Sequence, residues 1–186
     1  MVQTAQPQIK TAWVIDPVHS SVEFAVKHMV IATVKGRFTK FQIDADFDEA
    51  RPGSFGVAGT IDTASVDTGE AKRDEHLRSA DFFDAANFPQ ISFKSRRAEP
   101  RGKDEYRLIG DLIIRGTTRE VPFDVTFAGI VNDPWGSQRA GFNATATLNR
   151  KDFGLKWNAP LEAGGVVVGD AVKVNVEVEL VKQKQG

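Results

Sequence analysis

The residue types that could perform catalysis or bind a metal are few in this chain. Its 186 residues include three histidines and no cysteine, which excludes thiolate nucleophiles and thiolate metal sites. Asp16, His19 and Ser20 supply the residue types of a hydrolytic triad. However, adjacent residues on an extended segment point to opposite faces, and no Gly-x-Ser-x-Gly or His-x-x-x-His sequence is present. We therefore expect no catalytic residues and no metal site, and interpret His19 as a hydrogen-bonding residue of a turn.

A second polar group could meet the head of a bound molecule. Arg73, His76 and Arg78 stand together in a segment with helical spacing, and arginine matches the geometry of phosphate. His28 continues the apolar face of a predicted strand. The cluster around His76 has two interpretations: it either pins the helical segment to the rest of the protein or binds an anionic head group. The head-group candidates are thus His28, Arg73, His76 and Arg78.

Composition argues for apolar contents and against several partners. There are 13 phenylalanines but one tyrosine, so the interior offers rigid apolar surface with few polar groups to satisfy. The 24 basic and 25 acidic residues are mixed along the chain, which does not favour nucleic acid. The basic stretch 95–103 is interpreted as an exposed hairpin turn.

The sequence also bears on location. No stretch has the roughly 20 apolar residues of a membrane helix, and the first ten residues lack the apolar run of a secretory signal. A soluble, cytoplasmic protein is therefore expected, or a periplasmic one if a signal was removed.

The positioning elements are predicted from alternation with a period of two. In the last run, Val172, Val174, Val176, Val178 and Leu180 alternate with polar residues, the pattern of a strand with one buried face. Eight such runs occur, over 22–28, 41–47, 57–65, 91–95, 107–115, 121–127, 142–148 and 172–180. Glycine and proline turns separate them. Eight antiparallel strands fit a barrel or a two-sheet sandwich, and we favour the closed barrel because it leaves no exposed strand edge.

One segment interrupts the strands. Residues 68–88 have helical spacing, and Asp67 with Glu70, and Asp81 with Asp84, stand at the spacing of helix caps. We therefore expect two short helices here that cover one end of the barrel. The domain organisation expected is a flexible tail over residues 1–10, one barrel domain over 11–182, and a short tail over 183–186.

Several ordered motifs resemble the YceI-like family. They are Trp13–Ser20, Phe24–Met29, Thr68–Asp84 and Asn149–Leu155. The resemblance implies an all-β, lipocalin-like, extended eight-stranded antiparallel barrel. It also implies an isoprenoid lipid in the barrel, such as a polyprenyl phosphate or an isoprenoid quinone, with no further cofactor. Relatives can be dimeric, so a homodimer is a further expectation.

Thirteen positions are expected to point inward and to contact this ligand. They are Phe24, Val26, His28, Phe38, Phe93, Leu112, Phe123, Val125, Phe127, Phe142, Trp157, Val174 and Val176. Apolar faces more often pack on one another, so a structural or partner-binding domain with a solid core is the alternative to a cavity. Within binding, a scavenger of varied apolar compounds is the alternative to an isoprenoid carrier.

Overall fold

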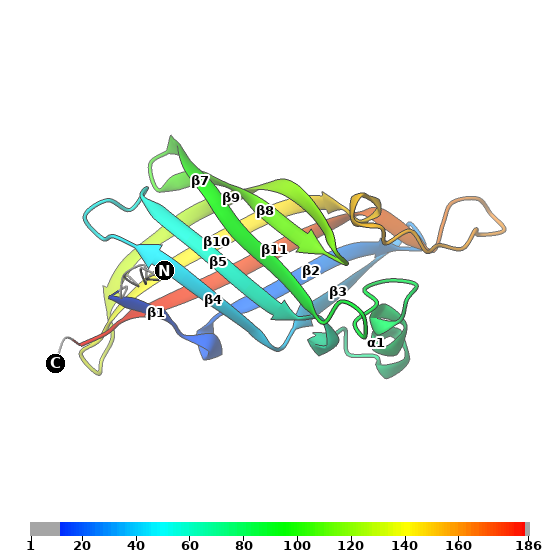
Figure 1. Cartoon of the computed structure of the whole chain (residues 1–186), viewed down its shortest axis with the longest axis horizontal. Helices are drawn as coiled ribbons and strands as arrows, with labels where there is room; N and C mark the ends of the chain where they lie inside the picture. Colours follow the sequence, from blue (N-terminus) through cyan, green and yellow to red (C-terminus); the bar gives the residue numbers. More distant parts are fainter. Residues whose placement is uncertain (1–11, 185–186) are drawn as a thin grey trace, which may run out of the picture.

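The computed structural model describes residues 12–184, which form one antiparallel sheet curled into an elongated barrel (Figure 1). The strands are β1 (Trp13–Ile15), β2 (Ser21–His28), β3 (Ala32–Phe38), β4 (Phe41–Phe47), β5 (Phe55–Asp62), β6 (Val66–Asp67), β7 (Gln90–Gly102), β8 (Glu105–Ile114), β9 (Thr117–Asn132), β10 (Gln138–Asn149) and β11 (Val168–Lys182). The helices among the described residues are η1 (Pro17–His19), η2 (Thr63–Ser65), α1 (Ala71–Arg78) and η3 (Arg150–Phe153), of which α1 is an α-helix and the others are 3₁₀ turns.

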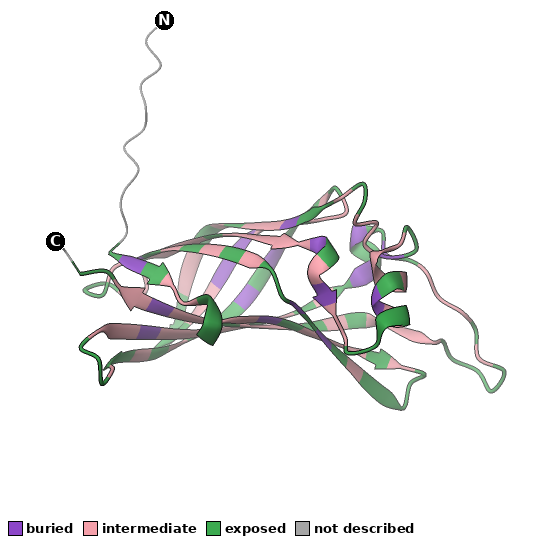
Figure 2. Ribbon diagram, turned by 90° about the horizontal axis from the view of Figure 1, so that it is seen from below, coloured by how far each residue is buried: buried purple, intermediate pink, exposed green. Residues whose placement is uncertain are grey.

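The strand order confirms the antiparallel barrel. It runs β4-β5-β7-β8-β9-β10-β11-β2-β3-β6, with β1 paired to the far part of β11. Val176 of β11 lies opposite Ala144 of β10 on one side and Val22 of β2 on the other. The alternating apolar residues of successive strands therefore share the inner face. Figure 2 shows buried and partly buried residues spaced among exposed ones along the strands.

The number of strands was predicted too low, since eight were expected and residues 12–184 contain eleven. Nine of these strands have seven or more residues, and among the nine β3 is the one that the alternation missed. Its inward position 36 is a glycine, so the pattern is broken there. The Phe24 ring occupies the missing side chain's place, because a Cβ on Gly36 would lie 2.4 Å from Phe24 Cζ. Stretch 95–103 was also misjudged: it is strand through Gly102, and the turn is only residues 103 and 104.

The expectation of a barrel without edges is wrong in detail. In the described residues the strand path ends at β4 and β6, with no ladder joining them. The seam is instead bridged by the turn between β3 and β4, where the Thr39 amide donates to Ser65 O (3.2 Å) and Lys40 O accepts from the Asp62 amide (2.9 Å). On the other side of the seam, Trp13 of β1 packs edge-on against Phe47 of β4 with 5.5 Å between ring centroids.

The segment 68–88 contains one α-helix rather than two. Glu70, not Asp67, caps α1, and its carboxylate accepts from the amides of Lys72 and Arg73. After the helix, the Ser79 hydroxyl donates to His76 O (2.6 Å) and the chain continues in turns. No second helix follows in residues 79–89, where Asp84 has a φ of 50°, outside the helical region. The segment covers the end of the barrel away from the chain termini (Figure 1).

The expected N-terminal and C-terminal tails lie largely outside residues 12–184. The N-terminal tail over residues 1–10 lies outside the described residues, as do the last two residues of the chain. The Gln183 amide donates to Ala12 O (2.7 Å). Within residues 12–184, no helix has the length and apolar character needed to span a membrane.

Candidate ligand-binding cavity

The barrel encloses an apolar cavity of about 250 Å³. Every one of the nine long strands contributes to its lining, as does the segment around α1. All of the cavity surface is made of apolar atoms. A cavity with such a lining holds hydrocarbon in preference to polar molecules, because a polar group inside it would lose its hydrogen bonds to water. The solid-core alternative is therefore not what the structure shows.

Ten of the thirteen predicted contact residues line this cavity. They are Phe24, Val26, Phe38, Phe93, Leu112, Phe123, Val125, Phe142, Val174 and Val176. They come from seven strands, and all except Phe38 of β3 lie on the runs that the period-two pattern marked. Their lining of the cavity is a structural fact, whereas their contact with a ligand stays a prediction.

The other three predicted residues do not line the cavity. Phe127 packs at the end near the termini, with ring centroids 5.6 Å from Phe47 and 5.1 Å from Phe142. Trp157 lies outside the lining and contacts Phe82, 5.5 Å between centroids. His28 is the last residue of β2, beyond Val26. All three are on or near apolar faces, but a strand pattern does not indicate where along the barrel the open space ends.

The prediction missed the lining residues of β4, β5 and the segments at the α1 end. They are Ile43, Phe47, Phe55, Val57, Ile61, Leu77, Phe82, Phe83, Phe153 and Leu155, among others. The lining residues of β4 and β5 could have been found from the same period-two alternation. The residues outside strands could not, because the approach of α1 and η3 to the barrel depends on tertiary packing.

Aromatic rings close the end of the cavity near the termini. We call this cluster the aromatic plug, made of Trp13, Phe47, Phe55, Tyr106, Phe127 and Phe142. Its rings meet in tilted and edge-to-face pairs with centroids 5.1 to 5.9 Å apart, a spacing at which each pair adds about 1 kcal/mol beyond area burial. Leu180 and Ala140 are buried beside it. Aromatic side chains therefore pack against one another across this end of the barrel.

A buried guanidinium organises the opposite end. Arg150 in η3 is 5% exposed, and its nitrogens donate to Leu155 O and Trp157 O (both 2.8 Å) and to Gly169 O (2.8 Å). Nη2 reaches Val168 O at 3.3 Å and Asp170 Oδ1 at 3.5 Å. Burial lowers the pKa of Arg150, and Asp170 opposes that shift. These bonds tie residues 155–169 to the barrel, and only the apolar atoms of Arg150 reach the cavity surface.

The predicted head-group residues lie outside the cavity lining. Arg73 Nε donates to Thr68 Oγ1 (2.7 Å) and its Nη2 to Thr68 O (2.9 Å). The His76 ring is 4.7 Å from that of Trp157, and its Nε2 hydrogen-bonds to Asp81 (2.8 Å). The contact of His76 with Trp157 matches the pinning interpretation, whereas the bonds of Arg73 stay within the segment 68–88.

Arg78 and His28, the other two head-group candidates, also lie outside the cavity lining. Arg78 is half-buried on α1, next to the cavity-lining Leu77. His28 lies opposite Val168 in the ladder between β2 and β11. A head-group role for any of the four residues stays a prediction.

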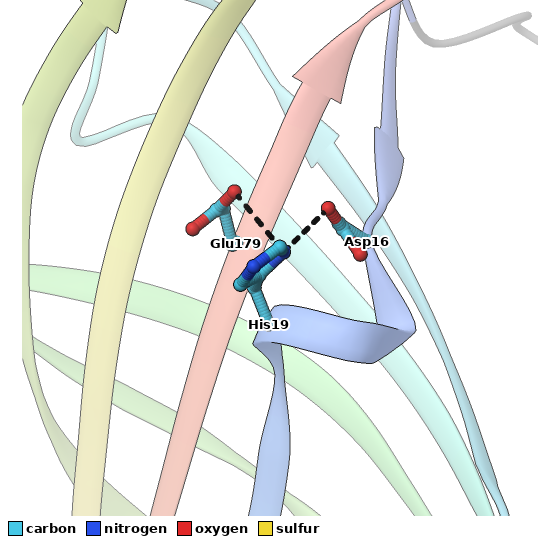
Figure 3. Close-up of side chains that lie close together, drawn as sticks. All are labelled: Asp16, His19 and Glu179. Atoms are coloured by element: carbon cyan, nitrogen blue, oxygen red, sulfur yellow. Dashed lines mark hydrogen bonds and ion pairs between the residues drawn. The ribbon is translucent and has the colours of Figure 1, made fainter. Parts of the chain in front are cut away.

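Asp16 and His19, two of the three residues that supply the residue types of a triad, lie beside Glu179 of β11 (Figure 3). His19 Nδ1 lies 2.9 Å from Asp16 Oδ2 and 4.0 Å from Glu179 Oε1. The Ser20 hydroxyl donates to Asp16 O (2.7 Å) and accepts from the Glu179 amide (3.0 Å), so it is used within the turn. The turn role expected for His19 is confirmed.

Two carboxylates and an imidazole this close could in principle hold a cation. Arg139 already contacts both carboxylates, at 2.8 Å from Asp16 and within hydrogen-bonding distance of Glu179, and it pairs with Asp133 at 2.8 Å. The hydrogen bond to His19 and then that to Arg139 lower the pKa of Asp16 to about 2. The cationic partner of these carboxylates is therefore Arg139, and the cluster ties η1 to β10 and β11.

An antiparallel barrel around an apolar cavity is the architecture of lipocalin-type binding proteins. The chain belongs to the YceI-like family, whose domain model matches residues 13–180. This match confirms the family resemblance seen in the sequence motifs.

Relatives and solved structures agree with that assignment. UPF0312 protein SA2479 of Staphylococcus aureus is 38% identical over 170 residues, which cover 91% of this chain and 96% of the relative. The structure of Burkholderia cenocepacia BcnA has a TM-score of 0.77 at 27% identity, covering 89% of this chain and 98% of BcnA. A polyisoprenoid binding domain from Saccharophagus degradans has a TM-score of 0.64 at 15% identity, covering 94% of this chain and all of that domain. This last likeness concerns the fold alone.

Proposed function

We propose that this protein binds a long isoprenoid lipid in the barrel cavity and carries or stores it without chemical change. The observation that carries the proposal is the cavity surface, which consists of apolar atoms only. Burial of hydrocarbon there contributes up to about 0.8 kcal/mol for each CH₂ group removed from water. The cavity surface offers no acid, base or nucleophile, which is why the proposal is binding rather than catalysis.

An isoprenoid is proposed over other apolar molecules for two reasons. The cavity extends from the aromatic plug near Phe47 to Leu155 and Arg150 at the α1 end, a shape that suits an extended chain. In addition, the Saccharophagus degradans protein of the same fold is a polyisoprenoid binding domain. Polyprenyl phosphates and isoprenoid quinones are the two ligand types that we propose to test first.

The first experiment identifies the bound molecule. Purified protein is extracted with organic solvent, and the extract is compared by mass spectrometry with a mock-purified control. A stoichiometric species that loses isoprene units in a regular series would support the proposal and name the head group. An extract whose dominant species is a straight-chain fatty acid or another non-isoprenoid compound would contradict it.

A competition experiment separates a specific carrier from a scavenger. The protein is loaded with a fluorescent apolar dye and titrated with prenyl alcohols of increasing length. We expect affinity to rise with each isoprene unit until the cavity is filled, because each unit buries further CH₂ and CH₃ groups. Unrelated apolar drugs that displace the dye as well as the best prenyl alcohol would favour the scavenger.

A matched pair of variants tests the cavity as the site. Val176 lines the cavity and Phe127 does not, so Val176→Trp should fill the space and weaken binding of a prenyl alcohol at least tenfold. Phe127→Trp enlarges a residue of the aromatic plug and should leave affinity within about twofold. Circular dichroism and thermal unfolding verify that both variants are folded. Equal affinity of folded Val176→Trp and the unsubstituted protein would place the ligand elsewhere.

A further inference from the structure

The turn between β2 and β3 exposes a run of apolar side chains at the α1 end of the barrel. Met29, Val30 and Ile31 are 43%, 65% and 88% exposed, and Val166 in the segment before β11 is 41% exposed. The two segments touch, since the Met29 amide donates to Val167 O (2.8 Å) and a Cβ on Gly165 would lie 3.2 Å from Val30 Cγ2. We call Met29, Val30, Ile31 and Val166 the apolar tip. Figure 1 shows this end lying opposite the chain termini.

The backbone of the apolar tip is strained at two residues that are not glycine. Met29 has a φ of 49° and Val30 a φ of 68°. This left-handed region suits glycine or asparagine, and a β-branched residue such as valine is an outlier there. A valine in this conformation, with two-thirds of its surface in water, contributes little to folding. Such strain points to a function for the apolar side chain outside the fold.

On the β2–β3 hairpin, Lys27 and Lys35 are the basic residues nearest the tip, whereas Glu162 lies in the turn before Val166. Between Glu23 and Asp44 the chain has no acidic residue, yet it holds Lys27, Lys35, Arg37 and Lys40. One of these, Arg37, is paired with Asp67 at 3.3 Å. The whole protein has a net charge of −1, so the β2–β3 hairpin is locally basic. A basic hairpin with an aliphatic tip matches an anionic lipid surface, since each lysine near such a surface contributes about 1 kcal/mol.

The tip lies next to the end of the cavity. Val26 and Val168 both line the cavity. His28 stands opposite Val168 in the ladder, and the tip begins at the next residue. A surface that receives the tip would therefore meet the barrel close to the α1 end of its cavity, rather than at the aromatic plug.

We infer that the apolar tip docks this protein on an anionic lipid bilayer, with the α1 end of the cavity facing the membrane. Four aliphatic side chains on two neighbouring turns are too few for a stable protein–protein interface, which buries at least about 1,200 Å². They suffice to enter the headgroup region of a bilayer when lysines assist. The inference rests on the proposed function only for the cargo, because docking itself is measured on vesicles without it.

Sedimentation with vesicles tests the tip directly. The probes are vesicles of phosphatidylcholine and phosphatidylglycerol in a 4:1 ratio, mixed with the full chain. Val30→Gly/Ile31→Ser removes two apolar side chains and permits the positive φ at position 30, so the variant should fold. We expect its vesicle binding to fall at least tenfold. The control is Trp135→Ser, which removes an apolar side chain that is 79% exposed in the β9–β10 turn at the other end, and it should bind like the unsubstituted protein.

A fluorescent label reports the orientation. The chain has no cysteine, so Ile31→Cys and Trp135→Cys each give one site for an environment-sensitive dye. The emission of the label at position 31 should shift to the blue when vesicles are added, and that at position 135 should not. A shift at position 135 alone would reverse the orientation and overturn the inference.

Three outcomes reject the docking surface. The unsubstituted protein does not sediment with vesicles, the tip variant sediments as well as it does, or the tip variant instead abolishes a dimer seen by analytical ultracentrifugation, which would assign the tip to a second copy. Failure of the proposed function is seen separately, as an extract without isoprenoid. If such a protein binds vesicles, docking is supported without the proposed function. If the protein carries an isoprenoid but does not sediment with vesicles, docking alone is rejected.

Discussion

At the end that carries the termini, aromatic rings fill the barrel, whereas the end that carries α1 is held by hydrogen bonds to a buried cation. Trp13 and Phe47, 2% and 6% exposed, pack edge-on with 5.5 Å between ring centroids. Arg150 instead holds residues 155–169 through backbone carbonyls. The first kind of contact depends on shape and buried area, and the second on the placement of donors and acceptors.

The difference indicates which end serves ligand exchange. Opening the aromatic plug would expose several large rings to water at once, which costs about 2 kcal/mol or more for each ring. At the α1 end, carbonyls released from Arg150 could hydrogen-bond to water, and the rings exposed by opening would be Phe82 and Trp157, whose centroids lie 5.5 Å apart. The exposed apolar tip stands at this same end. Three predictions test the comparison.

The largest expected effect comes from the aromatic plug. Trp13 is 2% exposed and does not line the cavity. Trp13→Ala should lower the free energy of unfolding by about 3–5 kcal/mol, because it leaves a hole in a packed cluster. Denaturant unfolding measures this loss, and prenyl alcohol affinity of the folded variant should change little. Val18→Ala is the control, since Val18 is 83% exposed. A loss below about 1 kcal/mol for Trp13→Ala would show that the plug is not the rigid end.

An intermediate effect is expected at Arg150. Arg150→Met keeps the apolar stem but leaves carbonyls at Leu155, Trp157 and Gly169 without their donor. We expect a loss of about 3 kcal/mol, together with faster amide hydrogen exchange confined to residues 155–169.

Arg96→Met supplies the control for that measurement. Arg96 pairs with Asp111 on the surface, where its side chain is 57% exposed, so its loss should cost less than about 1 kcal/mol. Exchange that accelerates equally at both ends of the barrel in Arg150→Met would remove the distinction between them.

The smallest expected effect concerns acid stability at the end near the termini. Hydrogen bonds to His19 and Arg139 lower the pKa of Asp16 from 3.8 to about 2. Because the folded pKa is below the unfolded one, this stabilisation is fully present above about pH 4 and is lost as the pH falls toward 2. Its size is on the order of 1–2 kcal/mol.

Denaturant unfolding at pH 5, 4 and 3 measures this contribution. The unsubstituted protein should lose more stability over this range than Asp16→Asn, which has no carboxylate to protonate. The exposed Asp44→Asn should follow the unsubstituted protein. Parallel curves for Asp16→Asn and the unsubstituted protein would show that the network around Arg139 does not depend on the charge of Asp16.

Much of the strand architecture could be predicted from the sequence, because alternation is a local property. Val174 and Val176 were placed correctly on the inner face, since a strand with one wet face repeats every two residues. The same rule failed at β3, where Gly36 has no side chain to mark the inner face and the Phe24 ring takes its place.

The candidate site was predictable only where it lies on strands. Phe93 and Leu112 were found, whereas Phe82, Phe153 and Leu155 were not. The last three lie in turns and short helices, whose positions against the barrel come from contacts between distant segments. Arg150 shows this most clearly, since its partners extend to residues 18 and 19 positions away.

The sequence by itself determined the antiparallel strands, their inner faces and the family, because each depends on residue order over short spans. Only the tertiary structure decided that the interior contains a cavity, that one end is an aromatic plug, and that Phe127 belongs to that plug. A cavity is the volume left after all segments have packed, and no single segment specifies it. The apolar tip is of the same kind, because its exposure depends on what the rest of the chain leaves uncovered.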